Sequence, residues 1–176
     1  MTSRASIITF RPCSEDQLPL LLRMQEEAFA SLPSPHMLRC NTPAMLAACL
    51  RTPHTTWGAW TEDAGLVAFS VLFVPQDAQE DLSLWLDGMA TAGLRSANNK
   101  LCIVRPPFRG RGLQLALGWR VEQEAVQRGT QLLCATAAPG NVASARNLLR
   151  QGYVLNRRLR KYEGGLLRNL YVKRLQ

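Results

Sequence analysis

The residues whose types and spacing could do chemistry lie between Val104 and Gln114, in the sequence VRPPFRGRGLQ. An apolar segment that favours a strand ends at two prolines, and a pattern typical of an amphipathic helix begins at Leu113. The first backbone N–H groups of a helix lack intrahelical partners and carry the positive end of its dipole. Glycines let the backbone approach a pyrophosphate closely, and arginines add charge and forked donors. The segment therefore predicts a site for a phosphate-bearing ligand.

Two other kinds of glycine-rich phosphate loop do not fit this segment. The chain has no G-x-x-x-x-G-K-[ST] sequence, which a P-loop requires. The dinucleotide-binding pattern needs a third glycine three residues after Gly112, and Leu115 stands there.

The segment resembles the acetyl-CoA signature of the Gcn5-related N-acetyltransferase (GNAT) superfamily, R/Q-x-x-G-x-G/A after a strand that ends in V-x-P. Arg109, Gly112 and Gln114 occupy the three defining positions, and Val104 and Pro106 match the strand end. Gln114 departs from the small residue of the family pattern. We expect its long side chain either to point away from the phosphates or to make a polar contact of its own.

A second match lies downstream. Asn141 and Ser144 open a helix that closes at Gly152-Tyr153, similar to the N-x-x-S/A…G-F/Y segment of the same superfamily. The two matches stand in the expected order and at the expected separation, which makes the pair more specific than either match alone.

The resemblance implies an acetyl-CoA-dependent N-acetyltransferase, in which a primary amine of a small molecule or peptide attacks the thioester directly. The backbone of Cys102, Ile103 and Val104 would bind the pantetheine arm like an added strand, and Val104 would also supply the backbone oxyanion donor. Asn141 would both cap a helix and contact the pantetheine or thiol end of the cofactor. The pyrophosphate would be wrapped by Arg109, Gly110, Arg111, Gly112, Leu113 and Gln114.

The general acid and base are less evident. An alkyl ammonium, whose pKa is about 10.4, must lose a proton before it attacks, and the departing thiolate must gain one. Leu148 stands where many family members have a tyrosine acid, and residues 98–100 (Asn-Asn-Lys) lack the familiar glutamate. The candidate substitutes are Tyr153 and Tyr162 as acids, with Glu163 or Asp87 as a base acting through water, although their positions favour a structural or exposed role for each.

Composition narrows the class of protein. A chain of 176 residues with 47% apolar residues is expected to form one domain over residues 1–176. Its five widely spaced cysteines and two histidines form neither a recognisable zinc site nor a disulfide framework, and we expect Cys102 and Cys134 to be small core residues. No metal is expected, and the absence of a long apolar stretch argues against a membrane span or a signal peptide. The cytoplasm is therefore the expected compartment.

The net charge of +8 leaves several partners open. It suits a polyanionic cofactor, an acidic substrate or nucleic acid, and it could also be only a solvated basic face. Few aromatic residues lie among the basic ones, so nucleic-acid binding is the weakest of these hypotheses. A coenzyme A-binding module without catalysis is the main alternative to an enzyme, and a homodimer remains possible for either.

Hydrophobic periodicity and turn signals predict the elements that position these residues. The expected class is α/β (α+β), with the GNAT fold: a mixed sheet of about six to seven strands flanked by about four helices. Strands are predicted over residues 7–11, 55–60, 66–74, 100–104, 131–136, 153–155 (with a possible extension to 162) and 167–175. Helices are predicted after the capping box at 14–17, from Thr42-Pro43, over 113–128 and over 142–151.

Two segments outside the cofactor motifs are expected to wall the acceptor site. One is the helix pair at 14–51 with its loop of residues 33–36, and the other is the long insertion at 76–99. The alternative for the insertion is that it covers a sheet edge, with Leu82, Trp85 and Leu86 as packing residues.

Overall fold

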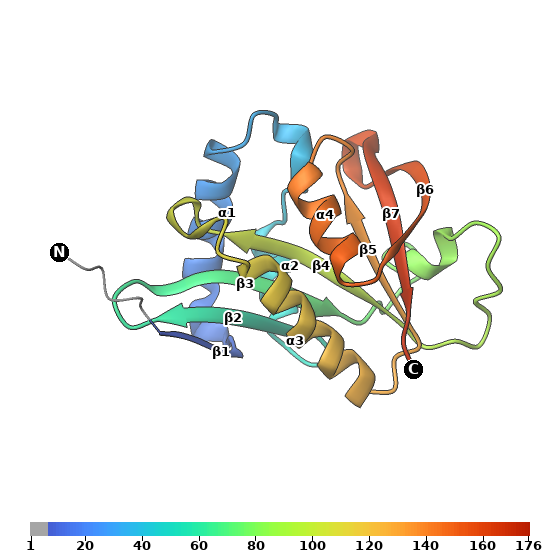
Figure 1. Cartoon of the computed structure of the whole chain (residues 1–176), viewed down its shortest axis with the longest axis horizontal. Coiled ribbons are helices and arrows are strands. Elements are labelled where there is room, and N and C mark those ends of the chain that lie inside the picture. The colour runs from blue at the N-terminus through green and yellow to red at the C-terminus, as the bar shows by residue number, and fades with distance from the viewer. Residues whose placement is uncertain (1–6) are drawn as a thin grey trace.

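The computed structural model describes residues 7–176, so the first six residues of the N-terminus, for which no signal peptide is expected, lie outside the described residues. The described residues form one seven-stranded sheet and four α-helices, which confirms the predicted fold class and order of elements (Figure 1). The strands are β1 (Ile8–Pro12), β2 (Thr55–Thr61), β3 (Gly65–Phe73), β4 (Ser96–Val104), β5 (Leu132–Ala137), β6 (Val154–Lys161) and β7 (Leu166–Arg174). The helices are α1 (Leu18–Ala30), α2 (Pro43–Cys49), α3 (Leu113–Gln127) and α4 (Val142–Arg150), with short 3-10 turns η2 (Pro35–Met37) and η3 (Leu82–Trp85).

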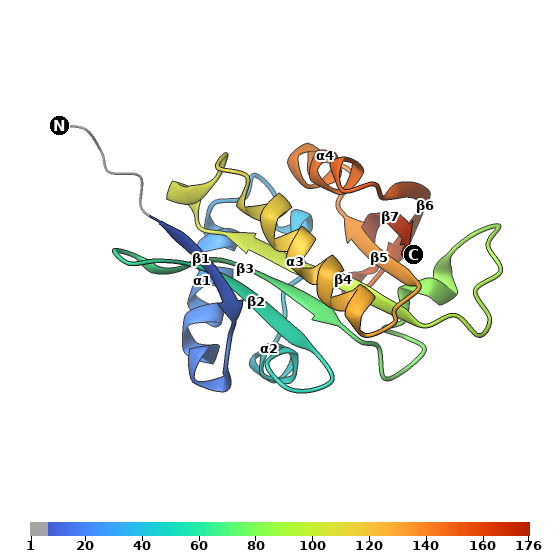
Figure 2. The same cartoon turned by 60° about the horizontal axis from the view of Figure 1, so that its bottom comes forward.

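The helices cover both faces of the sheet, α1 and α2 on one and α3 and α4 on the other (Figures 1 and 2). Leu21 of α1 and Leu46 of α2 are buried with β3 and β4 residues, whereas Val121 of α3 and Leu148 of α4 are buried on the opposite side. Each such side chain contributes about 1.5–3 kcal/mol by leaving water. Covered on both faces, β3 is a nearly continuous apolar strand rather than an alternating one.

The N-terminal capping box forms as expected, but it caps a different element. Gln17 Oε1 accepts a hydrogen bond from Ser14 N at 2.7 Å, and these two residues close a 3-10 turn. The α-helix proper begins at Leu18, with Pro19 in its first turn.

Strands β4 and β5 create an opening in the middle of the sheet. The strand order is β1-β2-β3-β4-β5-β7-β6, and β4–β5 is the one parallel pair among the described strands. These two strands pair only over Ser96–Asn98 and Leu132–Cys134. Beyond Asn98 the strands diverge, and the edge of β4 that faces β5 has no strand partner (Figures 1 and 2).

A β-bulge lies on β4 beside this opening. Phe69 of β3 pairs with Ile103 and Val71 pairs with Lys100, so Leu101 and Cys102 together face Ser70. Leu101 has φ 47°, a left-handed conformation that is unfavourable for a branched side chain. Because bulges redirect the backbone, this one changes the direction of the β4 polar groups at the opening.

Candidate active site

The loop that follows β4 has the backbone that a phosphate site needs. Gly110 and Gly112 both have φ 77°, and Gly112 is the N-cap of α3. A Cβ added at either glycine would meet no atom within 4 Å, so the space beside the loop is open. Leu113 is buried and fixes the start of α3 against the sheet. The first N–H groups of α3 are thus held at a surface that an anion can approach.

A cavity of about 490 Å³ extends from this loop along β4 to α4. Nine of the ten residues predicted to bind the cofactor line it: Cys102, Ile103, Val104, Arg109, Gly110, Gly112, Leu113, Gln114 and Asn141. The tenth, Arg111, lies outside the lining; its guanidinium donates to Pro107 O and lies over the Phe108 ring.

Two arginines that the motifs did not indicate also line this cavity. Arg146 and Arg150 lie four residues apart on α4, and with Arg109 they give the wall three guanidinium groups. No Asp or Glu is among the lining residues. The spacing of Arg146 and Arg150 after Asn141 could have revealed them, because residues four apart share one face of a helix. The wall is suited to a polyanion.

Arg109 also anchors the loop. Its Nε donates to Val104 O at 3.2 Å, and its Nη2 donates to Ser31 Oγ at 2.7 Å, just beyond α1. These bonds tie the loop to the end of β4 and to the opposite helical layer, which fixes the entry to α3.

Gln114 makes the polar contact expected for a long side chain at its position. Its Nε2 donates to Ser144 Oγ at 3.2 Å, and its Oε1 accepts from Asn147 Nδ2 at 2.9 Å. Both partners lie on α4, so the side chain joins α3 to α4. Asn141 Oδ1 accepts from Ser144 N at 3.1 Å and caps α4.

Replacing Gln114 with Ala is expected to keep acetyl-CoA affinity within about threefold and to lower the free energy of unfolding by about 1 kcal/mol. The stability falls because Asn147 and Ser144 lose a partner, while the backbone of the phosphate loop is unchanged. Calorimetry and thermal unfolding would measure the two effects, with Gln123→Ala on the exposed side of α3 as the control. A loss of affinity beyond about tenfold would identify the Gln114 side chain as a ligand.

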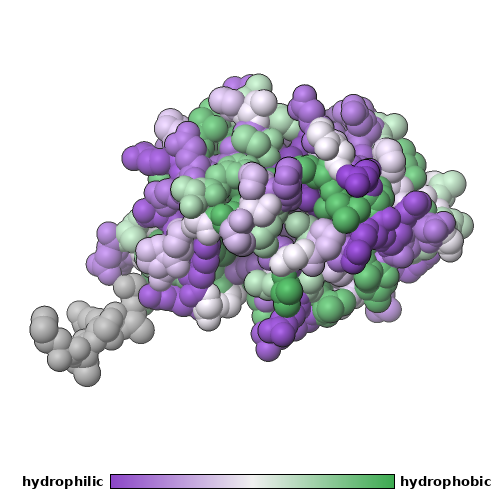
Figure 3. Space-filling model, turned by 90° about the horizontal axis from the view of Figure 1, so that it is seen from above, coloured by the Kyte–Doolittle hydropathy of each residue, from purple (hydrophilic) through white to green (hydrophobic). Residues whose placement is uncertain are grey.

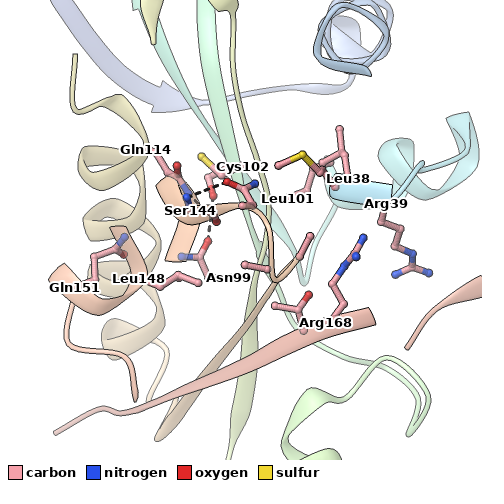
Figure 4. Close-up of a pocket in the computed structure, with 16 residues that line it drawn as sticks. Leu38, Arg39, Asn99, Leu101, Cys102, Gln114, Ser144, Leu148, Gln151 and Arg168 are labelled. Carbon is pink, nitrogen blue, oxygen red and sulfur yellow. Dashed lines mark hydrogen bonds between the residues drawn. The ribbon is translucent and has the colours of Figure 1, made fainter. Parts of the chain in front are cut away.

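A second cavity, of about 110 Å³, passes through the opening between β4 and β5 (Figure 4). It shares five lining residues with the larger cavity: Met37, Leu38, Cys102, Gln114 and Asn141. On the α3–α4 side its wall includes Leu148 and Gln151, and on the other side it includes Arg39 and Arg168 (Figure 4). The two cavities therefore meet beside the bulged part of β4.

The candidate acids and bases lie outside both cavity walls. The hydroxyl of Tyr153 is buried within 3.5 Å of Asn99 Nδ2, and burial raises its pKa. The hydroxyl of Tyr162 lies 2.9 Å from Thr136 Oγ1, and burial raises its pKa against the opposing effects of that hydrogen bond and of Arg39. Glu163 and Asp87 are exposed and line neither cavity. No Asp, Glu, His or Tyr is among the residues lining either cavity.

The thiols near the site are protonated at neutral pH. Burial raises the pKa of Cys102, which lines both cavities, to about 12, and it raises that of Cys134 in the core to about 12 as well. Only the thiolate is a nucleophile, so neither cysteine is activated for covalent chemistry.

The two segments predicted to wall the acceptor site differ in role. Within the helix pair at 14–51, Met37, Leu38 and Arg39 line the smaller cavity, whereas residues 33–36 line neither cavity. Of the insertion 76–99, Asn99 in β4 lines the smaller cavity, and no other residue of the insertion lines either cavity. The rest of the insertion matches the alternative expectation of sheet packing, because Leu82 and Leu86 pack against apolar side chains of β5, β6 and β7. The insertion also contacts a residue of the smaller cavity wall. The carboxylate of Glu80 forms ion pairs with Arg39, which lines that cavity, at 3.0 Å and with Lys100 at 3.3 Å.

Figure 3 shows the end of the molecule that is uppermost in Figure 1, where hydrophilic and hydrophobic residues are interspersed.

Within residues 7–176 no helix has both the length and the hydropathy needed to cross a membrane. In the same range, no group of three or more His, Cys, Asp or Glu side chains is arranged to hold a metal ion.

No protein-family model matches the chain, and no curated protein matches it by sequence. Solved structures do match. An N-acetyltransferase from Staphylococcus aureus Mu50 gives a TM-score of 0.72 at 16% identity, covering 97% of this chain and 100% of that one. A ribosomal-protein-alanine N-acetyltransferase from Brucella melitensis gives 0.71 at 20% identity, covering 95% and 99%.

A third match is a member of the GNAT superfamily with acetyl-CoA bound. This GNAT superfamily phosphinothricin acetyltransferase from Sinorhizobium meliloti, in complex with acetyl-CoA, gives a TM-score of 0.71 at 13% identity, covering 96% of this chain and 88% of that one. The likeness spans almost the whole chain, and identities this low establish the fold alone. The resemblance drawn from two short motifs is thus confirmed at the level of structure, and this chain has the GNAT fold.

Proposed function

We propose that the chain is an acetyl-CoA-dependent N-acetyltransferase acting on a primary amine. The observation that carries this proposal is the meeting of two cavities at the bulged, unpaired edge of β4. One cavity leads to the glycine-bearing start of α3, and the other leads through the sheet to its opposite face. A thioester and an amine could thus reach the same backbone segment from two sides.

The cofactor would lie along the larger cavity. The pantetheine arm would add to the free edge of β4 at Cys102, Ile103 and Val104, whose backbone would also supply the oxyanion donor. The pyrophosphate would bind the N–H groups of the 109–114 loop, with Arg146 and Arg150 supplying charge from α4. Acetyl-CoA in the Sinorhizobium meliloti structure supports this choice of cofactor.

The charges of the smaller cavity favour a neutral amine. Arg39 is paired with Glu80, but Arg168 also lines the cavity and is in none of the salt bridges among residues 7–176, so an ammonium bound beside Arg168 would have its pKa lowered by like charge. The ammonium would lose one proton to water, and the neutral amine would attack the acetyl carbonyl directly to form the N–C bond. As the C–S bond breaks, the nitrogen loses a second proton to water, which balances the proton that the departing thiolate takes up. The protonated thiol of Cys102 argues against an acyl-enzyme.

Of the two tyrosine candidates, Tyr162 is the better connected proton donor for the departing thiolate. Its hydroxyl is hydrogen-bonded to the hydroxyl of Thr136, and Thr136 lines the smaller cavity. The Thr136 hydroxyl can accept one proton and donate another, so it can pass a proton from Tyr162 to the cavity. Tyr153 reaches the cavity wall only through the amide of Asn99, which is a poor proton carrier.

A non-catalytic coenzyme A-binding module is the second candidate. The observation in its favour is that no carboxylate, imidazole or phenol lines either cavity.

Titration with acetyl-CoA, followed by measurement of thiol release with a panel of primary amines, tests both candidates. We expect saturable binding and thiol release that depends on the amine. Binding without release for any amine of the panel would favour the module, and absence of saturable binding would contradict both proposals.

A further inference from the structure

Arg168 is a buried guanidinium whose bonding is incomplete. It lies on β7, is 3% exposed and lines the smaller cavity. Its Nη1 donates to His36 O at 2.9 Å and to Leu167 O at 2.8 Å, whereas its buried Nη2 has no hydrogen-bond partner among residues 7–176. A buried donor without a partner is unfavourable, and a buried charge is more so.

No carboxylate of the described residues compensates this charge. The nearby Glu80 is shared between Arg39 and Lys100, and none of the described salt bridges includes Arg168. Burial lowers the pKa of Arg168, Arg39 lowers it further, and Tyr162 opposes them. The hydrogen bonds to His36 O and Leu167 O require only an N–H donor, which a neutral side chain could also supply without a buried positive charge. An anion bound beside Arg168 would compensate this charge and give Nη2 a partner.

The position of Arg168 limits what that anion can belong to. In Figure 4, Arg168 lies near Leu38 and Arg39, across the cavity from Gln114 and Ser144. The acetyl group of a cofactor would lie toward Cys102, where the two cavities meet. A molecule bound between these places would present one end to the guanidinium and the other to the thioester.

On the basis of the proposed function, we infer that the acceptor is a small amine that carries a carboxylate, bound by Arg168, so that its amine faces the bulge of β4. A planar carboxylate matches the fork of a guanidinium and would satisfy the free Nη2. The small volume of this cavity, about 110 Å³ against about 490 Å³, favours a compact, amino-acid-like acceptor over a long peptide.

The test uses N-acetylated compounds, which are products of the proposed reaction. Their amide nitrogen does not titrate, so the difference in affinity between a carboxylate and its carboxamide depends only on the negative charge. N-acetylglycine, N-acetyl-β-alanine and N-acetyl-γ-aminobutyrate, each paired with its carboxamide, are titrated by calorimetry into protein saturated with coenzyme A. We expect at least one carboxylate to bind about tenfold or more tightly than its carboxamide. Equal affinities in all three pairs, or no binding of any carboxylate, would overturn the inference.

Two variants locate the effect. Arg168→Gln should abolish the carboxylate preference and leave carboxamide affinity unchanged. Arg160→Gln, at an exposed arginine whose guanidinium donates to Gly165 O, should retain the preference. Preference retained in a folded Arg168→Gln variant would contradict the assignment. If that variant does not fold, Arg168→Lys, which keeps the charge but not the planar fork, is expected to weaken the preference, and the wild-type pairs remain decisive.

The two proposals fail differently. Coenzyme A affinity and amine-dependent thiol release test the acetyltransferase function without reference to the carboxylate. A protein that binds coenzyme A and acetylates amines, yet does not distinguish the paired ligands, would retain its function and lose this inference.

Discussion

A Gly112→Asp variant is expected to lose acetyl-CoA affinity by at least about 100-fold. Gly112 has φ 77° and lines the larger cavity, with open space where a Cβ would project. A carboxylate there would repel the pyrophosphate at the start of α3, where the helix otherwise favours an anion. The side chain would also be in a left-handed conformation, which costs about 1–2 kcal/mol. Calorimetry with acetyl-CoA measures the loss.

The chain offers a matched control at Gly164. This glycine has φ 76° and an equally open Cβ position, and it lies in the turn between β6 and β7, away from both cavities. Gly164→Asp therefore introduces the same charge with nearly the same backbone cost. We expect similar losses of thermal stability in the two variants but normal affinity in Gly164→Asp. Normal affinity in a folded Gly112→Asp variant would show that the cofactor does not bind this loop.

Reversing the charge of Arg146 and Arg150 together is expected to weaken acetyl-CoA binding by about 30-fold or more at low salt. Both side chains are exposed on α4 and line the cavity that contains the phosphate loop. Glutamates at these positions would replace attraction of the phosphates by repulsion, and salt screens such interactions over about 10 Å at 0.1 M. The affinity difference from the wild type, measured by calorimetry over a salt series, should therefore shrink as the salt concentration rises.

The control for this double variant is Arg157→Glu with Arg174→Glu. These exposed arginines on β6 and β7 line neither cavity, and the net charge changes by the same amount. If both double variants lose equal affinity, the effect comes from the overall field of the protein and not from the wall of the cavity.

Local chemistry made much of this protein predictable from its sequence. The glycines of residues 110–112, the two prolines before them and the apolar periodicity from Leu113 specify a turn and a helix start through backbone conformation alone. The helix cap at Asn141 and the hairpin of residues 154–174 depend likewise on neighbouring residues. From these features the order of helices and strands could be predicted, together with nine residues that line the larger cavity.

The smaller cavity could not be predicted from the sequence, because the residues that line it come from segments far apart in the chain and are brought together only by tertiary packing. The divergence of β4 from β5 depends on where their pairing stops, and neither strand's sequence encodes that limit. Gln114 finds Asn147 across 33 positions, and Arg168 reaches His36 O across 132. The insertion looked like a wall because it is long, but its apolar side chains are more stable against β5, β6 and β7 than in water. Sequence patterns report local backbone preference and burial, whereas only packing determines which distant side chain is left without a partner.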